Sequence, residues 1–258
     1  MTETDGKPKS KPLVAAALGL GTLLGIILLT ELLIRLSVIS RFVIPPPSEI
    51  AMSFGRVITQ EDVVGRFFIT MGETVAAGAL LTVVGVPLGV ALHRFAVLRQ
   101  ATETWIAAYA AAPVVLAYPL FLVICGRNSW TIIVMAFLNG LAPVILKTLE
   151  GLSAIKPVLL NLGRSYRMTP WQQFWRLLFP AALPAIFTGL RLGLIFAMIS
   201  IVGVEFLINL GGLGPLINTL SERYDMPGTY AAICFVVLVS IIFFVLLERI
   251  ERWLQPRR

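Results

Sequence analysis

Charged residues are scarce in this chain of 258 residues: Asp, Glu, Lys and Arg together make up 14% of it. Soluble domains carry roughly 25%, so the shortage excludes an ordinary soluble globular protein. Hydrophobic residues make up 57%, and the mean hydropathy is +0.88. We therefore expect an integral membrane protein.

Side chains for catalysis and metal binding are also scarce. His93 is the single histidine, which excludes a histidine-pair metal site, and its place in a short basic turn argues against a Ser-His-Asp triad. Cys125 and Cys234 belong to no ligand or redox spacing. The phosphate-binding motif G-x-x-x-x-G-K-[ST] is absent, so the chain is not expected to hydrolyse ATP. The sequence predicts a protein that is not an enzyme and has no metal or cofactor of its own.

Six apolar runs are long enough to cross ~30 Å of hydrocarbon as helices. They cover residues 13–38, 71–93, 102–125, 129–147, 182–209 and 229–253. The connections are too short for a soluble domain, and no internal repeat is visible. We therefore expect an all-α polytopic fold, with six transmembrane helices in a single membrane domain over residues 1–258. Six spans place both termini on one side.

The distribution of Lys and Arg indicates which side that is. Fourteen of the 21 basic residues fall in the tail at 1–12, in the connections at 94–99 and 147–176, and at 249–258. By the positive-inside rule these segments, including both termini, are cytoplasmic. The formal net charge of +7 then reflects topology and contact with anionic membrane lipid rather than nucleic acid.

Residues 40–66 fall on the opposite, extracytoplasmic side. Pro45–Pro47 cannot continue the first helix, and Ser48 with Glu49 offers a new helix start. Apolar residues then recur at roughly helical spacing, which favours a short surface helix over the alternative of an exposed loop.

Prolines lie in or beside several spans: Pro87, Pro113, Pro119, Pro143 and Pro184. In a membrane helix, proline frees a backbone carbonyl that a neighbour must satisfy, so it is typical of bends inside a bundle. Bent helices suit a moving pathway and a static bundle equally well.

The longest cytoplasmic connection, residues 148–181, predicts two short helices that meet at an angle. Thr169 is placed as N-cap, Pro170 as the first helical residue and Gln172 as the capping-box partner, so a helix should run from Pro170 to near Pro180. Because Pro170 disfavours helical dihedrals at Thr169, a preceding helix over 157–166 must end before it.

The second of these helices carries one apolar face. Its members share i, i+3, i+4 and i+7 spacing: Trp171, Phe174, Trp175 and Leu178. The face either rests at headgroup depth or contacts a partner protein. For the two tryptophans the bilayer is favoured.

Four separated patches, in order along the chain, resemble the permease subunits of ABC importers, in the branch that transports sulfonates, taurine and nitrate. Three patches are Ile44–Ile50, Val84–Leu92 and Val204–Ile217. The fourth joins the cytoplasmic loop to the fifth span through the signature residues Pro180, Pro184, Gly189 and Arg191, with Leu178 and Leu190 beside them.

The resemblance implies a type I ABC importer permease in the bacterial inner membrane. It implies two partner ATPase subunits that bind ATP and Mg, a second permease that is identical or homologous, and an extracytoplasmic binding protein that delivers a small solute such as a sulfonate, taurine or nitrate. ATPase coupling is then expected at Asn161, Leu162, Gly163, Arg164, Ser165, Arg167, Met168, Thr169, Pro170, Phe174 and Trp175.

The sequence departs from the family's loop at two places. Asn161, Leu162 and Gly163 stand where the family has Glu-Ala-Ala, and Arg167 replaces the usual glycine. Because an arginine with positive φ is uncommon, we expect Thr169 and Pro170 to supply the bend instead. The altered loop indicates either an unusual ATPase or one of two different permease subunits.

Ionisable residues at membrane depth default to functional hypotheses. Glu31 and Arg35 are spaced to neutralise each other, and Glu73 and Glu103 lie near span ends where solvation is expected. Glu205 lies deeper and is equally compatible with a pathway residue and a buried structural partner. Arg191 is expected to face a carboxylate or the loop.

The candidate pathway residues are Tyr118, Asn139, Glu205 and Asn209. No residue pattern identifies the solute. Two other classes remain open from the residues: a channel or secondary transporter that works without ATP, in which Glu31, Glu73 or Glu205 would couple ions, and a membrane scaffold with no pathway.

Overall fold

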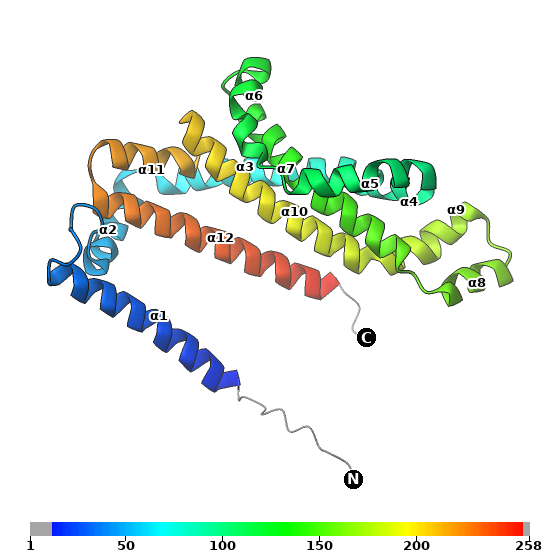
Figure 1. Ribbon diagram of the computed structural model, residues 1–258, viewed down its shortest axis with the longest axis horizontal. Coiled ribbons are helices and arrows are strands. Elements are labelled where there is room, and N and C mark those ends of the chain that lie inside the picture. The colour runs from blue at the N-terminus through cyan, green and yellow to red at the C-terminus, as the bar shows by residue number, and fades with distance from the viewer. Residues whose placement is uncertain (1–11, 255–258) are drawn as a thin grey trace, which may run out of the picture.

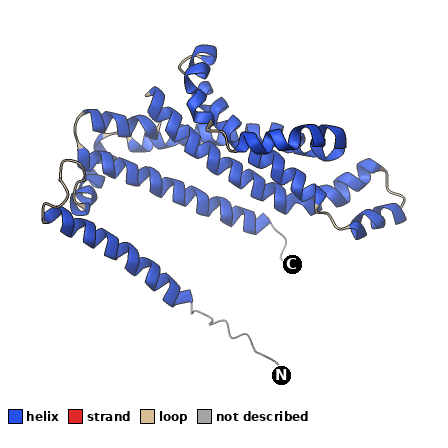
Figure 2. Cartoon of the chain, in the orientation of Figure 1, coloured by secondary structure: helices blue, strands red, loops and turns tan. Residues whose placement is uncertain are grey.

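The computed structural model describes residues 12–254, and every regular element in that part of the chain is helical (Figures 1 and 2). The first half contains α1 (Pro12–Arg35), α2 (Pro47–Gln60), α3 (Val63–Leu80), the π-helical turn η1 (Leu81–Gly85), α4 (Val86–Arg94), α5 (Ala96–Ala110), the 3-10 turn η2 (Val114–Ala117) and α6 (Tyr118–Cys125). The second half contains α7 (Ser129–Ser153), α8 (Pro157–Ser165), α9 (Pro170–Gln173), the π-helical turn η3 (Phe174–Leu178), α10 (Phe179–Ile208), α11 (Leu213–Glu222) and α12 (Met226–Leu254). The predicted all-α fold is confirmed. The tail at 1–11 lies outside the described residues.

Five helical runs are long and apolar enough to cross a membrane, and a sixth is present if α5 and α6 count as one broken span. The span predicted over 102–125 is not one continuous helix, because its two halves, α5 and α6, meet at 87°. The break falls at Pro113, whose backbone has left the helical region (φ −76°, ψ 75°). Proline has no N–H to continue the helix and disfavours helical dihedrals at Ala112.

The prediction that the cytoplasmic helix ends near Pro180 is also wrong. α9, η3 and α10 run on without a gap, and Pro180 lies in the first turn of α10. In the preceding π-helical turn, the Phe179 N–H bonds to the Phe174 carbonyl five residues back. A wider turn relieves the clash that a proline ring makes with the carbonyl four residues before it. The π-helical turn η1 stands at the same spacing before Pro87.

α7 and α10 form the centre of the bundle and pack side by side (Figure 1). Small residues permit this contact. A Cβ atom on Gly140 would lie 2.4 Å from the carbonyl oxygen of Gly193, and one on Gly193 would lie 2.8 Å from that of Gly140. Buried side chains of α3, η1, α7 and α10 complete the core, among them Ala77, Leu81, Ile132, Met135, Ala197 and Ile201. Close backbone approach through small residues is typical of helices that pack within a membrane.

Replacing Gly140 with alanine should lower the free energy of unfolding by about 1–3 kcal/mol, because the methyl group forces α7 and α10 apart. Gly55→Ala on α2 is the matched control, since nothing lies within 4 Å of its added Cβ atom. Thermal denaturation of both variants in detergent measures the effect. Equal melting temperatures for the two variants would contradict the close contact.

α1 diverges from the rest of the molecule and contacts it at one end, through α2 (Figure 1). The predicted Glu31–Arg35 ion pair is confirmed at 2.7 Å. Glu31 also accepts hydrogen bonds from the Ser48 N–H at 3.1 Å and the Ser48 hydroxyl at 2.8 Å. The carboxylate thereby caps the start of α2, a helix that confirms the prediction for residues 40–66 over the loop alternative. Most apolar side chains along α1 are exposed, as a lipid-facing helix requires.

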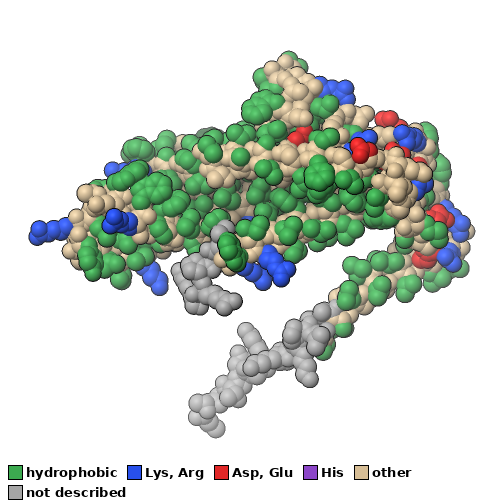
Figure 3. All heavy atoms as spheres, turned by 180° about the vertical axis from the view of Figure 1, so that it is seen from behind, with side chains coloured by type: hydrophobic (Ala, Val, Ile, Leu, Met, Phe, Trp, Pro, Cys, Tyr) green, Lys and Arg blue, Asp and Glu red, His purple; other side chains and the backbone are tan. Residues whose placement is uncertain are grey.

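Hydrophobic side chains also cover much of the bundle's surface between its ends (Figure 3). Exposed leucine, isoleucine, valine and phenylalanine occur on α3, α5, α10 and α12 as well as on α1. Exposed apolar surface of this extent suits contact with lipid or with another membrane helix.

Candidate functional site

The cytoplasmic connection forms two short helices, α8 and α9, at one end of the bundle, remote from α2 and α11 (Figure 1). The predicted capping box is present: the Gln172 N–H donates to Thr169 Oγ1 at 3.3 Å, and the Thr169 N–H donates to Gln172 Oε1 at 3.1 Å. α8 ends at Ser165, before Thr169, as predicted. The predicted break between two helices is therefore confirmed, although the second helix continues into α10.

The expectation that Arg167 avoids positive φ is wrong. Its φ is 51°, in the left-handed region. The Met168 N–H bonds to the Gly163 carbonyl at 3.0 Å and the Arg167 N–H to the Arg164 carbonyl at 2.9 Å. This pair of hydrogen bonds is the Schellman motif, which satisfies carbonyls at a helix end and offsets the strain of a left-handed arginine. Arg167 thus bends the chain itself, and Thr169 starts the next helix.

The inner side of α8 packs on α9. Gly163 is buried, and a Cβ atom there would lie 3.0 Å from Gln173 Nε2. The same Gln173 nitrogen donates a hydrogen bond to the Leu160 carbonyl at 3.2 Å. Because this contact ties the two helices together, a force applied to α8 is transmitted to α9.

The outer side of α8 carries an exposed apolar stripe. Val158, Leu162 and Tyr166 are 73%, 42% and 71% exposed, and their i, i+4, i+8 spacing places them on one helix face. Further exposed members of the predicted coupling set flank them: Asn161, Arg164, Ser165, Arg167, Thr169 and Pro170. The coupling set predicted from the sequence omitted Val158 and Tyr166. Their i, i+4, i+8 spacing with Leu162 was the signal that could have identified this helix face.

The predicted apolar face of the second helix is divided by the structure. Phe174 and Leu178 pack against the core, whereas Trp171 and Trp175 are 70% and 46% exposed. Trp175 contacts the rings of Trp171, Phe174 and Phe179 edge-on or tilted, with centroids 5.1–5.5 Å apart. Phe174 therefore anchors the helix, and the tryptophans remain available to lipid or a partner.

The loop-to-span signature lies on α10. Arg191 forms an ion pair with Glu251 on α12 at 2.9 Å, so the prediction that it faces a carboxylate is confirmed. Gly189 lies against Lys147 of α7. Pro184 is accommodated inside α10, and its carbonyl accepts a hydrogen bond from the Thr188 hydroxyl at 3.0 Å. These residues fix α10 between α7 and α12.

Glu205 is fully buried and links three helices. Its Oε1 accepts a hydrogen bond from the Thr70 hydroxyl of α3 at 2.8 Å, and its Oε2 accepts one from the Gly214 N–H at 2.9 Å. Thr70 Oγ1 in turn accepts the Leu213 N–H at 3.0 Å. Leu213 and Gly214 begin α11, so Glu205 caps that helix, which favours the structural interpretation of this residue.

The other candidate pathway residues are dispersed. Tyr118 packs on the core at the start of α6. Asn139 of α7 donates a hydrogen bond to the Phe196 carbonyl of α10 at 3.0 Å. Asn209 ends α10 in a left-handed conformation, and its carbonyl accepts a hydrogen bond from Arg127. Their part in translocation stays a prediction.

The expected solvation of Glu73 is wrong, because its side chain is buried one turn after Thr70 on α3. Glu103 is half-exposed and pairs with Arg99 at 2.8 Å. In the described part of the chain, no group of three or more His, Cys, Asp or Glu side chains could hold a metal ion.

Comparison with known proteins identifies relatives over most of the chain. Residues 81–258 match the family described as binding-protein-dependent transport system inner membrane component. The taurine transport system permease protein of Escherichia coli is 26% identical over 247 residues, 93% of this chain and 89% of that protein. The formylaminopyrimidine transport permease protein of Halalkalibacterium halodurans is 27% identical over 221 residues, 84% and 86% of the two chains.

The fold also has a counterpart among solved structures. A chain of an inward-facing methionine ABC transporter superposes with a TM-score of 0.65 at 20% sequence identity, covering 75% of this chain and 96% of that one.

Proposed function

We propose that this chain, which belongs to the family of binding-protein-dependent transport inner membrane components, forms the pathway of an ABC importer together with a second permease. The transported solute would be a small anion such as a sulfonate, taurine or nitrate. The fold is that of type I ABC importer permeases. The chain is a multi-pass inner-membrane permease component of an ABC importer, from a family with a transport role and no catalytic one. The matches give no support to an ATP-independent channel or secondary transporter.

One observation carries the proposed mechanism: the α8–α9 segment stands at the end of the bundle and exposes an apolar stripe on its outer side. Two partner ATPase subunits, one on each permease, would dock there and bury Val158, Leu162 and Tyr166. ATP and Mg belong to those partners. Because the face is rich in Lys and Arg, we place it in the cytoplasm, with both termini.

Movement of the docked segment would reach the translocation pathway through one continuous helical run. Residues 170–208 have no break, so a displacement at α9 moves α10 as a rigid lever of roughly 60 Å at about 1.5 Å per residue. The far end of that lever carries Glu205, which caps α11. ATP would drive transport only through its different affinity for the inward-open and outward-open arrangements.

The solute is proposed from the relatives, since an extracytoplasmic binding protein would select it. The taurine permease supports a sulfonate, and the formylaminopyrimidine permease shows how widely the relatives' solutes differ. Taurine is therefore the first solute to test.

The proposed assembly is tested by affinity purification of the tagged chain from its native membrane, followed by mass spectrometry. We expect an ATPase subunit to remain bound. One permease species would indicate a homodimer, and a second permease would explain the altered loop. Recovery of no ATPase, under conditions that preserve a control importer, would contradict the proposal.

A further inference from the structure

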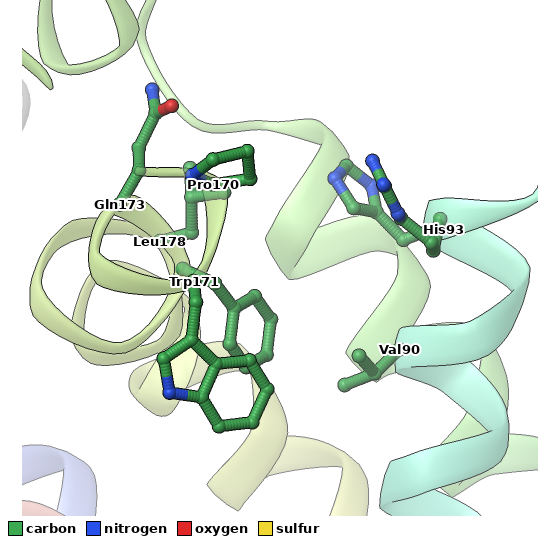
Figure 4. Close-up of a pocket in the computed structure, with 8 residues that line it drawn as sticks. Val90, His93, Pro170, Trp171, Gln173 and Leu178 are labelled. Atoms are coloured by element: carbon green, nitrogen blue, oxygen red, sulfur yellow. The ribbon is translucent and has the colours of Figure 1, made fainter. Parts of the chain in front are cut away.

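A cleft of about 540 Å³ separates the end of α4 from the α9–η3 segment (Figure 4). α4 contributes Val90 and His93 to its lining, and the α9–η3 segment contributes Pro170, Trp171, Gln173 and Leu178. Arg94 and Phe174 complete the lining. Arg94 and Trp171 are exposed, so the cleft is accessible from outside the bundle.

The floor and the rim of this cleft differ in chemistry. Val90, Phe174 and Leu178 pack against the hydrophobic core and form an apolar floor. Arg94 and His93 supply nitrogen donors at the rim. Within residues 12–254, neither side chain takes part in an ion pair or a side-chain hydrogen bond. An unpaired guanidinium beside an apolar floor is suited to an amphipathic anion.

Two features of the cleft are typical of the depth at which lipid headgroups lie. Arg94 ends the span that begins at Val63. Trp171 is largely exposed at the opposite wall, and tryptophan is enriched at the membrane–water boundary. Basic pockets between helices on the cytoplasmic side of a membrane bind anionic headgroups.

We propose that this cleft binds one anionic phospholipid of the cytoplasmic leaflet. Its phosphate would lie between Arg94 and His93, and the first part of one acyl chain would cover Val90, Phe174 and Leu178. A free phosphate ion would leave that apolar floor in contact with water, which is why we assign a lipid. The bound lipid would fill the space between α4 and α9 and so hold the α8–α9 segment at a set angle to the bundle.

Trp171 provides the probe for the test, because bromine atoms on an acyl chain quench a nearby indole. The full-length chain is placed in phosphatidylcholine nanodiscs that contain a minor fraction of either brominated phosphatidylglycerol or brominated phosphatidylcholine. Subtracting the signal of Trp171→Phe isolates the quenching of Trp171 from that of the other tryptophans.

We expect brominated phosphatidylglycerol to quench Trp171 more strongly than brominated phosphatidylcholine. Arg94→Gln should lower the apparent affinity for phosphatidylglycerol about fivefold, as loss of about 1 kcal/mol from one basic residue near the membrane surface predicts. Arg94→Lys should retain most of the preference. Arg249→Gln, which removes an exposed arginine of α12 outside the cleft, should leave the preference unchanged.

Equal quenching by the two lipids, or an unchanged preference in Arg94→Gln, would overturn the proposal. Displacement of the brominated lipid by millimolar inorganic phosphate would also overturn it, since the site would then take a soluble anion. The measurement uses no transport readout, so its outcome is independent of the proposed importer function.

Discussion

An acidic residue on the exposed stripe of α8 is expected to release the partner ATPase and to abolish uptake, while the chain still reaches the membrane. Leu162→Glu and Tyr166→Asp each place a carboxylate where an apolar docking surface would form. Burying an unpaired charge costs several kcal/mol, so we expect at least about a tenfold loss of ATPase affinity, which corresponds to about 1.4 kcal/mol.

Co-purification of the ATPase measures this effect directly, and uptake of labelled taurine measures its consequence. Val97→Glu is the matched control, because Val97 is an exposed apolar residue near the start of α5, outside the stripe. Normal co-purification and uptake in both stripe variants would exclude the stripe from the interface.

The structure also sharpens the expectation from the sequence that Phe174 and Trp175 take part in ATPase coupling, which a charged residue at either position would disrupt. Phe174 packs against the core, so a charged residue there would destabilise the helix as well. Trp175 is half-exposed. Trp175→Glu is therefore the informative variant, and normal ATPase binding in it would leave contact with the bilayer as the role of this side chain.

Replacing Glu205 with alanine is expected to produce the largest loss of stability in the chain. The substitution leaves the Thr70 hydroxyl and the Gly214 N–H without their acceptor in a fully buried site. Each unsatisfied buried donor costs about 1–3 kcal/mol, so the free energy of unfolding should fall by about 2–6 kcal/mol. Glu205→Gln should lose less, because its amide oxygen can still accept one of the two hydrogen bonds.

Thermal unfolding of the purified protein in detergent measures these differences. Thr70→Val should also be destabilised, since the Thr70 hydroxyl joins α3 to α10 and α11. Thr74→Val is its control, because the Thr74 hydroxyl is equally buried and bonds only to the Thr70 carbonyl of its own helix at 2.7 Å. A Glu205→Ala variant as stable as the unmodified chain would show that the buried carboxylate is not the cap of α11.

Features that depend on neighbours in the sequence could be predicted from it. The membrane runs follow from mean hydropathy over some twenty residues, and the capping box at Thr169 and Gln172 requires groups only three residues apart. The Glu31–Arg35 pair likewise spans one helical turn. Local hydrogen bonds and the transfer of apolar side chains from water to lipid therefore determined the all-α fold, most of the membrane spans and the presence of two helices in the cytoplasmic connection.

The remaining features were decided by tertiary structure. They depend on residues that lie far apart in the chain, or on a choice between backbone conformations of similar energy. Glu205 and Thr70 are separated by 135 residues, so no local pattern distinguishes a buried cap from a pathway residue. Pro113 breaks its helix, whereas Pro180 follows a π-helical turn that accommodates its ring. Proline alone does not decide between these outcomes, since the surrounding packing determines whether the freed backbone groups find partners.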